Sequence, residues 1–185
     1  MLALQLLLLA LLFSLPCRGL VADSFDERRA HVGLKLFRTL VAADLQVADK
    51  VGANGNLSIY LVYANNDSAA QEYQQTLAAS FSSVRDVPVK TEVVSLNDIL
   101  TTNKPKPAAI FVAQQLNDAE LQSLVRHSIA KHIILFSPFE GDVEQGVLGG
   151  LSVEATVRPL INMHTLSASQ LQIKNFYLKV AKQYE

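Results

Sequence analysis

The sequence predicts an α/β fold with a mainly parallel sheet, helices on both faces, a C-terminal antiparallel hairpin and a terminal helix. Short, almost wholly apolar runs rich in β-branched residues recur along the chain, as expected of strands buried on both faces. Segments with helical periodicity separate these runs. Near the C-terminus one segment instead alternates apolar and polar residues. This order of elements is typical of a parallel sheet that ends in an antiparallel hairpin.

The chain begins with an apolar run that predicts an export signal. Residues 2–16 carry no charge and are fewer than the roughly 20 residues that a transmembrane helix needs. Cleavage is expected after Gly19 or Ala22, which assigns 1–22 to a signal peptide and predicts a periplasmic protein. An uncleaved anchor and a lipoprotein lipidated at Cys17 are the alternatives.

Length and composition narrow the class of the remaining domain. Residues 23–185 are numerous enough to form one hydrophobic core, and the single cysteine excludes an internal disulfide. The chain holds 16 Lys and Arg against 17 Asp and Glu, a formal net charge of −1. The sequence shows no basic patch that could neutralise the phosphates of a nucleic acid, so nucleic-acid binding is not expected.

The first half of the domain is expected to contain two helix–strand units. An amphipathic pattern predicts a helix over 23–41, with Asp23, Ser24 or Asp26 as its cap. Polar residues after the first strand are expected to cap the next helix. The elements that follow the first helix are expected to be a strand over 57–63, a helix from about 65 to 84, a strand over 89–95 and a short helix over 97–100.

The second half begins with two more buried strands and ends differently. The spacing predicts strands over 108–113 and 132–137 with a helix between them, capped by Asn117 or Asp118. The remaining elements are expected to be an alternating strand over 150–159 that Pro159 ends, a short strand over 160–163, and a helical tail from Thr165 with a break near Asn175.

The sequence contains no pattern that predicts catalysis. It has no G-x-S-x-G motif for a nucleophilic serine and no H-E-x-x-H motif for zinc. His127 and His132 are assigned to a helix end and a strand start, and a solvated acidic loop best explains the carboxylates of 140–144. A hairpin turn or bulge best explains the glycines Gly149 and Gly150. No catalytic residue, metal or cofactor is therefore expected.

Polar residues follow three of the predicted parallel strands. Open α/β sheets bind ligands at the carboxyl ends of their strands, so these residues predict a polar mouth that suits a neutral polar ligand. Helix caps and turns are the alternative explanation, because Asn, Asp and Ser favour both. The candidate ligand-binding residues are Asn65, Asn66, Gln114, Gln115, Ser137 and Glu140.

A contact surface for another protein would need exposed apolar side chains. Candidates lie on the first predicted helix and near the C-terminus. They are Phe25, Phe37, Leu40, Phe176 and Tyr177.

The last 40 residues carry a resemblance to a known family. Gly149 and Gly150 lead into an alternating strand, then Ile161 and Asn162, and then a segment rich in Ser and Leu. This order resembles the end of the YfiR-like periplasmic regulatory proteins, and the three buried strands before it fall in the family's order. The resemblance implies a dimer-forming periplasmic regulator without catalytic residues.

What such a regulator would contact also follows from the resemblance. Its implied partner is the ectodomain of a membrane-anchored sensor kinase or diguanylate cyclase, which it restrains by protein–protein contact. The alternative function is a small periplasmic solute-binding component of a transport or sensing system. A hydrolase is the third hypothesis, and the missing pairing of nucleophile and base argues against it.

Overall fold

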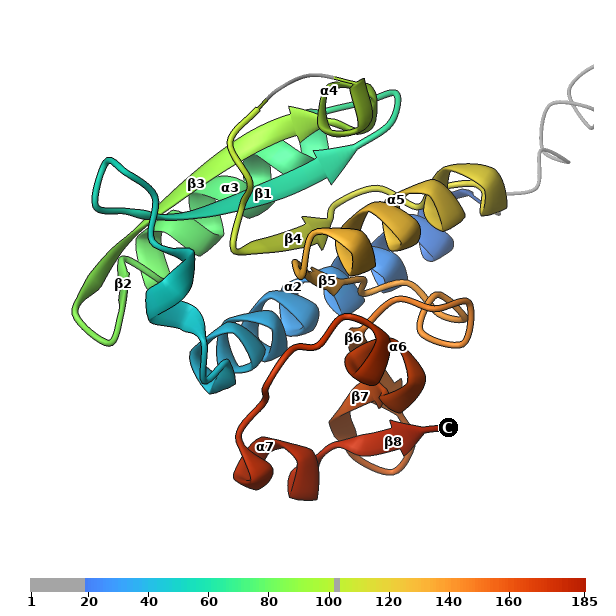
Figure 1. The fold of residues 1–185 in the computed structure, drawn as a ribbon. Coiled ribbons are helices and arrows are strands. Elements are labelled where there is room, and N and C mark those ends of the chain that lie inside the picture. The colour runs from blue at the N-terminus through green and yellow to red at the C-terminus, as the bar shows by residue number, and fades with distance from the viewer. Residues whose placement is uncertain (1–18, 102–103) are drawn as a thin grey trace, which may run out of the picture.

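The computed structural model, which describes residues 19–101 and 104–185, has the predicted α/β class (Figure 1). The described residues form one eight-stranded sheet in the order β2-β3-β1-β4-β5-β6-β7-β8. Strands β3, β1, β4, β5 and β6 run parallel to one another, and β8 runs parallel to β7. The β2–β3 and β6–β7 pairs are antiparallel. The strands are β1 (Leu57–Tyr63), β2 (Ser83–Val84), β3 (Val87–Ser95), β4 (Ala109–Val112), β5 (Ile134–Phe136), β6 (Gly149–Val153), β7 (Val157–Asn162) and β8 (Lys182–Tyr184).

Helices cover both faces of the sheet, as predicted. Helices α2 and α3 share one hydrophobic cluster with the sheet, and α4 and α5 share the other. No helix within the described residues is long and apolar enough to cross a membrane. The helices are α2 (Gly19–Ala43), the 3-10 helix η1 (Val47–Lys50), α3 (Ser68–Ser80), α4 (Leu96–Thr101), α5 (Asp118–Ala130), α6 (Met163–Ala168) and α7 (Asn175–Val180).

The period of two in the buried strands separates the two core layers. In β4, Phe111 belongs to the cluster of α2 and α3, whereas its neighbours Ile110 and Val112 belong to the cluster of α4 and α5. Phe111 contacts Phe37 of α2 with ring centroids 5.5 Å apart and stacks on Phe136 of β5 at 5.8 Å. This aromatic group ties α2 to the centre of the sheet.

The strand order creates a switch point beside β1. This strand has β3 on one side and β4 on the other, and the connecting helices α3 and α5 lie on opposite faces. The carboxyl ends of β1 and β4 therefore flank the switch point, which is the position at which open α/β sheets bind ligands.

The N-terminal helix is longer than predicted. It spans Gly19–Ala43, so it begins before the predicted start at Asp23. Residues 1–18, which include most of the predicted signal peptide and Cys17, lie outside the described residues. Three predicted caps lie inside α2 and not at its start: Asp23, Ser24 and Asp26.

A short hairpin replaces the predicted end of the second helix. Helix α3 ends at Ser80, not at Val84, and Val84 belongs to β2. Arg85 and Asp86 join β2 to β3 with φ angles of 47° and 67°. Two consecutive positive φ angles define a type I′ turn, which suits the twist of a two-residue hairpin.

The C-terminal region departs most from the sequence prediction. The predicted strand over 150–159 is split into β6 and β7, and Pro159 lies inside β7 opposite Leu151. The helical tail is shorter than predicted, because it consists of the two short helices α6 and α7 and the edge strand β8 follows them. The chain between the two helices is extended and bridges Ile173 to Asp44 after α2. This path buries Leu171, Ile173 and Tyr177. The burial of these side chains stabilises the extended path more than a continuous helix would be stabilised by its own propensity.

Candidate functional site

A side chain of the protein itself bridges the two strand ends at the switch point. The Gln114 side chain, directly after β4, reaches the loop after β1 and accepts three hydrogen bonds through Oε1. The donors are the backbone N–H groups of Ala64, Asn65 and Asn66, at 3.0, 3.0 and 3.2 Å. Asn66 Oδ1 in turn accepts a hydrogen bond from Ser68 N at the start of α3. The structure thus brings three predicted ligand residues together, Asn65, Asn66 and Gln114, but they hydrogen-bond to one another in an internal network.

Gln115 and Ser137 do not take part in this hydrogen-bond network. Gln115 is exposed beside Gln114, and Ser137 is fully buried after β5. Ser137 Oγ donates to Asp142 Oδ2 at 2.5 Å and accepts from the backbone N–H of Phe139 at 3.2 Å. The prediction that Ser137 contacts a ligand is therefore wrong, because its hydroxyl supports the following loop from inside.

The loop between β5 and β6 is held by several such buried or half-buried groups. The Asn162 side chain donates to the carbonyl of Val143, and Thr165 donates to the carbonyl of Gly146, both at 2.8 Å. Burial raises the pKa of Asp142 to about 6, although the hydrogen bond from Ser137 acts in the opposite direction. The sequence analysis assigned this segment to a solvated acidic loop, but Asp142 is an internal anchor.

The two adjacent glycines before the hairpin allow this loop to pack closely. A Cβ on Gly150 would lie 2.6 Å from a methyl carbon of Val143 and 3.0 Å from the backbone oxygen of Ser137. A Cβ on Gly149 would lie 2.7 Å from a methyl carbon of Leu40. Gly149 and Gly150 are therefore the first residues of β6 and not part of a turn. Their missing side chains allow Leu40 and Val143 to approach the strand closely.

This loop, the start of α2 and the β6–β7 hairpin enclose a charged cavity of about 350 Å³. Arg29, which is buried, donates from Nε to the carbonyl of Pro138 at 3.0 Å and forms one wall. Glu140, the last predicted ligand residue, is exposed in another wall, away from Gln114. Glu154 on the hairpin pairs with Lys182 at 2.6 Å, and hydrogen bonding to that lysine lowers the pKa of Glu154.

An apolar groove of about 410 Å³ adjoins the charged cavity. Three of its side chains are about half exposed: Phe25 at 49%, Val153 at 48% and Val157 at 45%. Val32 of α2 and Leu151 of β6 form its floor. The groove thus lies between the N-terminal helix and the C-terminal hairpin, two segments at opposite ends of the sequence.

The structure separates the predicted partner-binding residues into exposed and buried groups. Phe25 is exposed in the apolar groove, and Phe176 on α7 is 78% exposed. Phe37, Leu40 and Tyr177 are buried in the core that includes α2. Their assignment to a contact surface is wrong, because their side chains are buried and cannot reach a partner.

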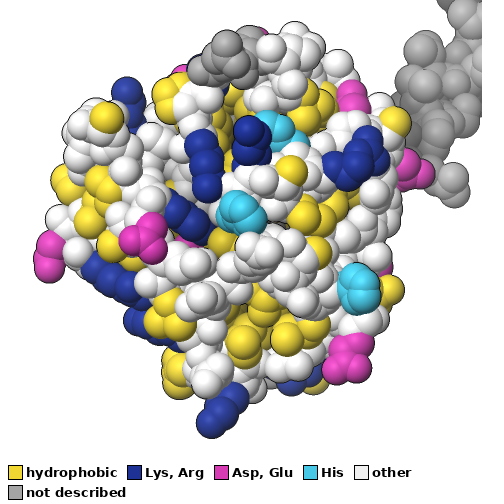
Figure 2. Space-filling model, viewed as in Figure 1, with side chains coloured by type: hydrophobic (Ala, Val, Ile, Leu, Met, Phe, Trp, Pro, Cys, Tyr) yellow, Lys and Arg dark blue, Asp and Glu magenta, His cyan; other side chains and the backbone are white. Residues whose placement is uncertain are grey.

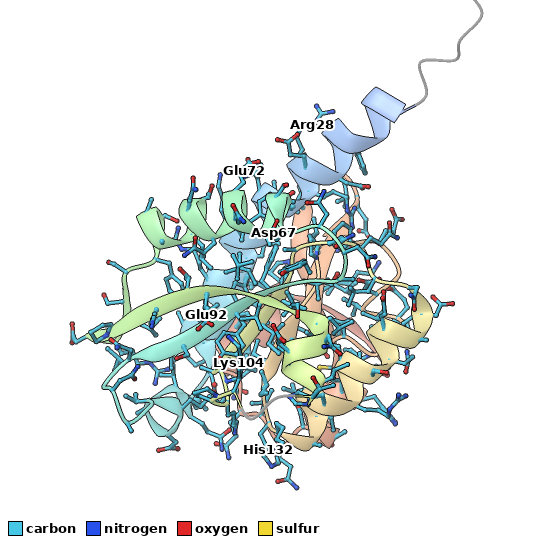
Figure 3. The ribbon with its side chains drawn as sticks, turned by 90° about the horizontal axis from the view of Figure 1, so that it is seen from above. Arg28, Asp67, Glu72, Glu92, Lys104 and His132 are labelled. Atoms are coloured by element: carbon cyan, nitrogen blue, oxygen red, sulfur yellow. The ribbon has the colours of Figure 1, made fainter. Side chains whose placement is uncertain are left out.

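A second feature that the sequence analysis did not anticipate is a group of lysines around a cavity of about 370 Å³: Lys50, Lys90, Lys104 and Lys106. Figure 2 shows Lys and Arg side chains over much of the viewed face, some of them beside histidines near its centre. Two of the lysines are neutralised by ion pairs, Lys50 with Asp44 at 2.6 Å and Lys104 with Glu92 at 2.5 Å (Figure 3).

Comparisons with known proteins bear on the fold. No protein-family model and no curated protein matches the sequence. The structure is similar to a conserved domain protein from Vibrio cholerae O1 biovar El Tor, with a TM-score of 0.52 and 12% identity over 78% of this chain and 60% of that chain. The ABC domain in complex with L-Trp from Streptococcus pneumonia has a TM-score of 0.49 and 16% identity, over 77% of this chain and 61% of that chain. This chain thus spans less than two thirds of either protein, and the likeness to the first shows a shared fold alone.

Proposed function

We propose that this domain is an exported, non-catalytic binding module that regulates a membrane-anchored signalling enzyme by protein contact. The observation that carries the proposal is the apolar groove between α2 and the β6–β7 hairpin. Two features of the sequence support the rest: the apolar run of residues 2–16, and the resemblance of the C-terminal region to the YfiR-like regulators.

The groove has the properties of a contact surface. Val153 and Val157 are paired directly across the hairpin, so their side chains lie on the same face of the sheet. Phe25 of α2 lines the same groove, and all three side chains are about half exposed. Isolated exposed apolar residues are ordinary on protein surfaces, but a contiguous group of them marks an interaction site.

The lining of the groove indicates the chemistry of its occupant. Arg28 and Arg29 stand beside the apolar side chains. A partner segment with apolar side chains would match the exposed apolar lining of the groove. We assign this segment to the ectodomain of a membrane-anchored sensor kinase or diguanylate cyclase. A second copy of this domain is the competing occupant.

The test is recovery of the partner from membranes. The purified domain is crosslinked to membranes of the source cells, solubilised in detergent and captured, and the captured proteins are identified by mass spectrometry. We expect a sensor kinase or cyclase with the wild type. V157D should reduce its recovery about tenfold or more, because burying one valine contributes about 1.5 kcal/mol.

F176D is the matched control, because Phe176 is exposed on α7 and does not line the groove. It should recover the enzyme as the wild type does. The proposal fails if V157D recovers the enzyme undiminished, if only a second copy of the domain is captured, or if no signalling enzyme is recovered.

A second candidate function is solute binding in the charged cavity. Its volume of about 350 Å³ falls within the range of small-molecule sites. Its lining includes both basic residues, Arg29 and Lys182, and acidic residues such as Glu140 and Glu144, a composition that suits a small molecule bearing both charges. A thermal-unfolding screen against zwitterionic metabolites tests this function. A rise in melting temperature that E144Q abolishes would support it, and no rise with any compound would exclude it.

A further inference from the structure

Three potential metal ligands meet outside the groove, on the face of the sheet covered by α2 and α3. Glu27 and His31 belong to α2, and Glu72 belongs to α3. One carboxylate oxygen of each glutamate and one ring nitrogen of His31 all lie within 4.8 Å of one another. The sequence analysis considered only the pair His127 and His132 and did not find this group.

The separation of two of these atoms is informative. His31 Nε2 lies 3.5 Å from Glu72 Oε1. This is longer than an ordinary N–H···O hydrogen bond, which spans about 2.7–3.2 Å. Two ligand atoms bound to one tetrahedral Zn²⁺ at 2.0–2.1 Å are separated by about 3.3 Å. The observed spacing therefore fits two corners of a metal coordination tetrahedron.

The backbone positions of the three ligands are fixed by the fold. Glu27 and His31 are four residues apart on one helix, so both side chains project from the same face. Ala30 and Leu34 of α2 share a buried cluster with α3, which holds the two helices together. Figure 3 shows Glu72 on α3, which lies beside α2.

The orientation of the imidazole is also constrained. The His31 and Tyr73 rings pack in a T-shaped arrangement, with centroids 5.6 Å apart and planes at 79°. Tyr73 is buried and follows Glu72 directly in α3. Helix α3 therefore both orients the His31 ring, through Tyr73, and supplies the carboxylate of Glu72. Glu27 is exposed, so its side chain can rotate to complete the site.

We propose that Glu27, His31 and Glu72 bind one divalent transition-metal ion, with water as a further ligand. The two carboxylates balance the charge of the ion, and the imidazole favours Zn²⁺ or its neighbours over Mg²⁺ and Ca²⁺, which take oxygen ligands. The bound ion would crosslink α2 to α3.

The experiment is a titration of the tag-free domain with ZnCl₂ after treatment with a chelator, followed by isothermal calorimetry. We expect one Zn²⁺ per chain, and at least tenfold weaker binding in each of H31A, E27Q and E72Q. H164A is the matched control, since His164 is exposed on α6, and it should bind as the wild type does.

A second measurement separates loss of the site from loss of the fold. Zn²⁺ should raise the melting temperature of the wild type and of H164A, because an ion that binds only the folded state stabilises it. It should leave H31A unchanged, while far-UV circular dichroism shows all variants folded. Absence of Zn²⁺ uptake by the wild type, or unchanged binding in H31A, overturns the proposal. Neither result bears on the contact surface formed by the apolar groove.

Discussion

The hydroxyl of Ser137 donates a hydrogen bond to the carboxylate of Asp142 over 2.5 Å, and both side chains are buried. The pair follows β5 directly and anchors the loop that forms one wall of the charged cavity. Burial raises the pKa of Asp142 from 3.8 to about 6, so the folded protein holds this proton more tightly than the unfolded chain does.

The first prediction follows from this shift in pKa. The stabilisation from proton uptake is complete below the unfolded pKa of 3.8 and is lost as the pH rises through about 6. D142N removes the titrating group and keeps the shape. Between about pH 4 and pH 7, the free energy of unfolding of D142N should rise relative to wild type by roughly 2–3 kcal/mol. Urea unfolding at several pH values measures this.

D86N serves as the control for this experiment, because Asp86 is exposed in the β2–β3 turn and Asn tolerates its positive φ. Its pH dependence should equal that of the wild type. An identical pH dependence in D142N and wild type would show that Asp142 does not titrate differently on folding.

The second prediction concerns Gln114, which bridges the carboxyl ends of β1 and β4. Q114A removes the acceptor of three backbone N–H groups and should lower the free energy of unfolding by about 1–3 kcal/mol. Hydrogen exchange should quicken at Asn65 and Asn66. Q115A alters an exposed neighbour and should change stability by less than about 0.5 kcal/mol. Equal effects of the two substitutions would contradict the structural role of Gln114.

The third prediction concerns Gly150. Its substitution by Ala should destabilise the protein by about 1–3 kcal/mol, because the new Cβ would overlap Val143 and crowd the backbone oxygen of Ser137. Thermal unfolding measures the change, with S152A two residues further along β6 as the control. If G150A melts at as high a temperature as S152A, the loop that contains Val143 can move to accommodate the new Cβ without loss of stability, and the prediction is contradicted.

The fourth prediction separates the core from the surface. F37A removes a buried ring that contacts Phe111 and Phe136, and it should cost about 3–5 kcal/mol in the free energy of unfolding. F176A, on the exposed α7 side chain, should cost less than about 0.5 kcal/mol. Chemical denaturation of both variants provides the comparison, and a small effect of F37A would contradict its place in the core.

Much of the central fold could be predicted because its signals are local. The uninterrupted apolar run of β1 indicated a strand buried on both faces, and the capping box of Asn117 and Glu120 lies where a helix start was expected. The hairpin was predicted in kind, but its turn was misplaced, because the alternation of apolar and polar residues continues from β6 through the turn into β7.

The candidate site was predicted only in part, since its residues depend on long-range contacts. Asn65, Asn66 and Gln114 were expected to meet because the carboxyl ends of neighbouring parallel strands share one edge of the sheet. Nothing local distinguishes the buried Ser137 from an exposed one. The i, i+4 spacing of Glu27 and His31 was readable in the sequence, but their third partner on α3 was not.

The sequence by itself determined the class of the fold, because hydrophobic period and turn chemistry report how each segment must bury its apolar face. Tertiary structure alone decided which side chains remain exposed: it buried Phe37, Leu40 and Tyr177 and left Phe25 in a groove with Val157. It also turned the end of the chain into a strand beside β7. Burial depends on which distant segment covers a residue, and that is a property of the packed chain and not of its local pattern.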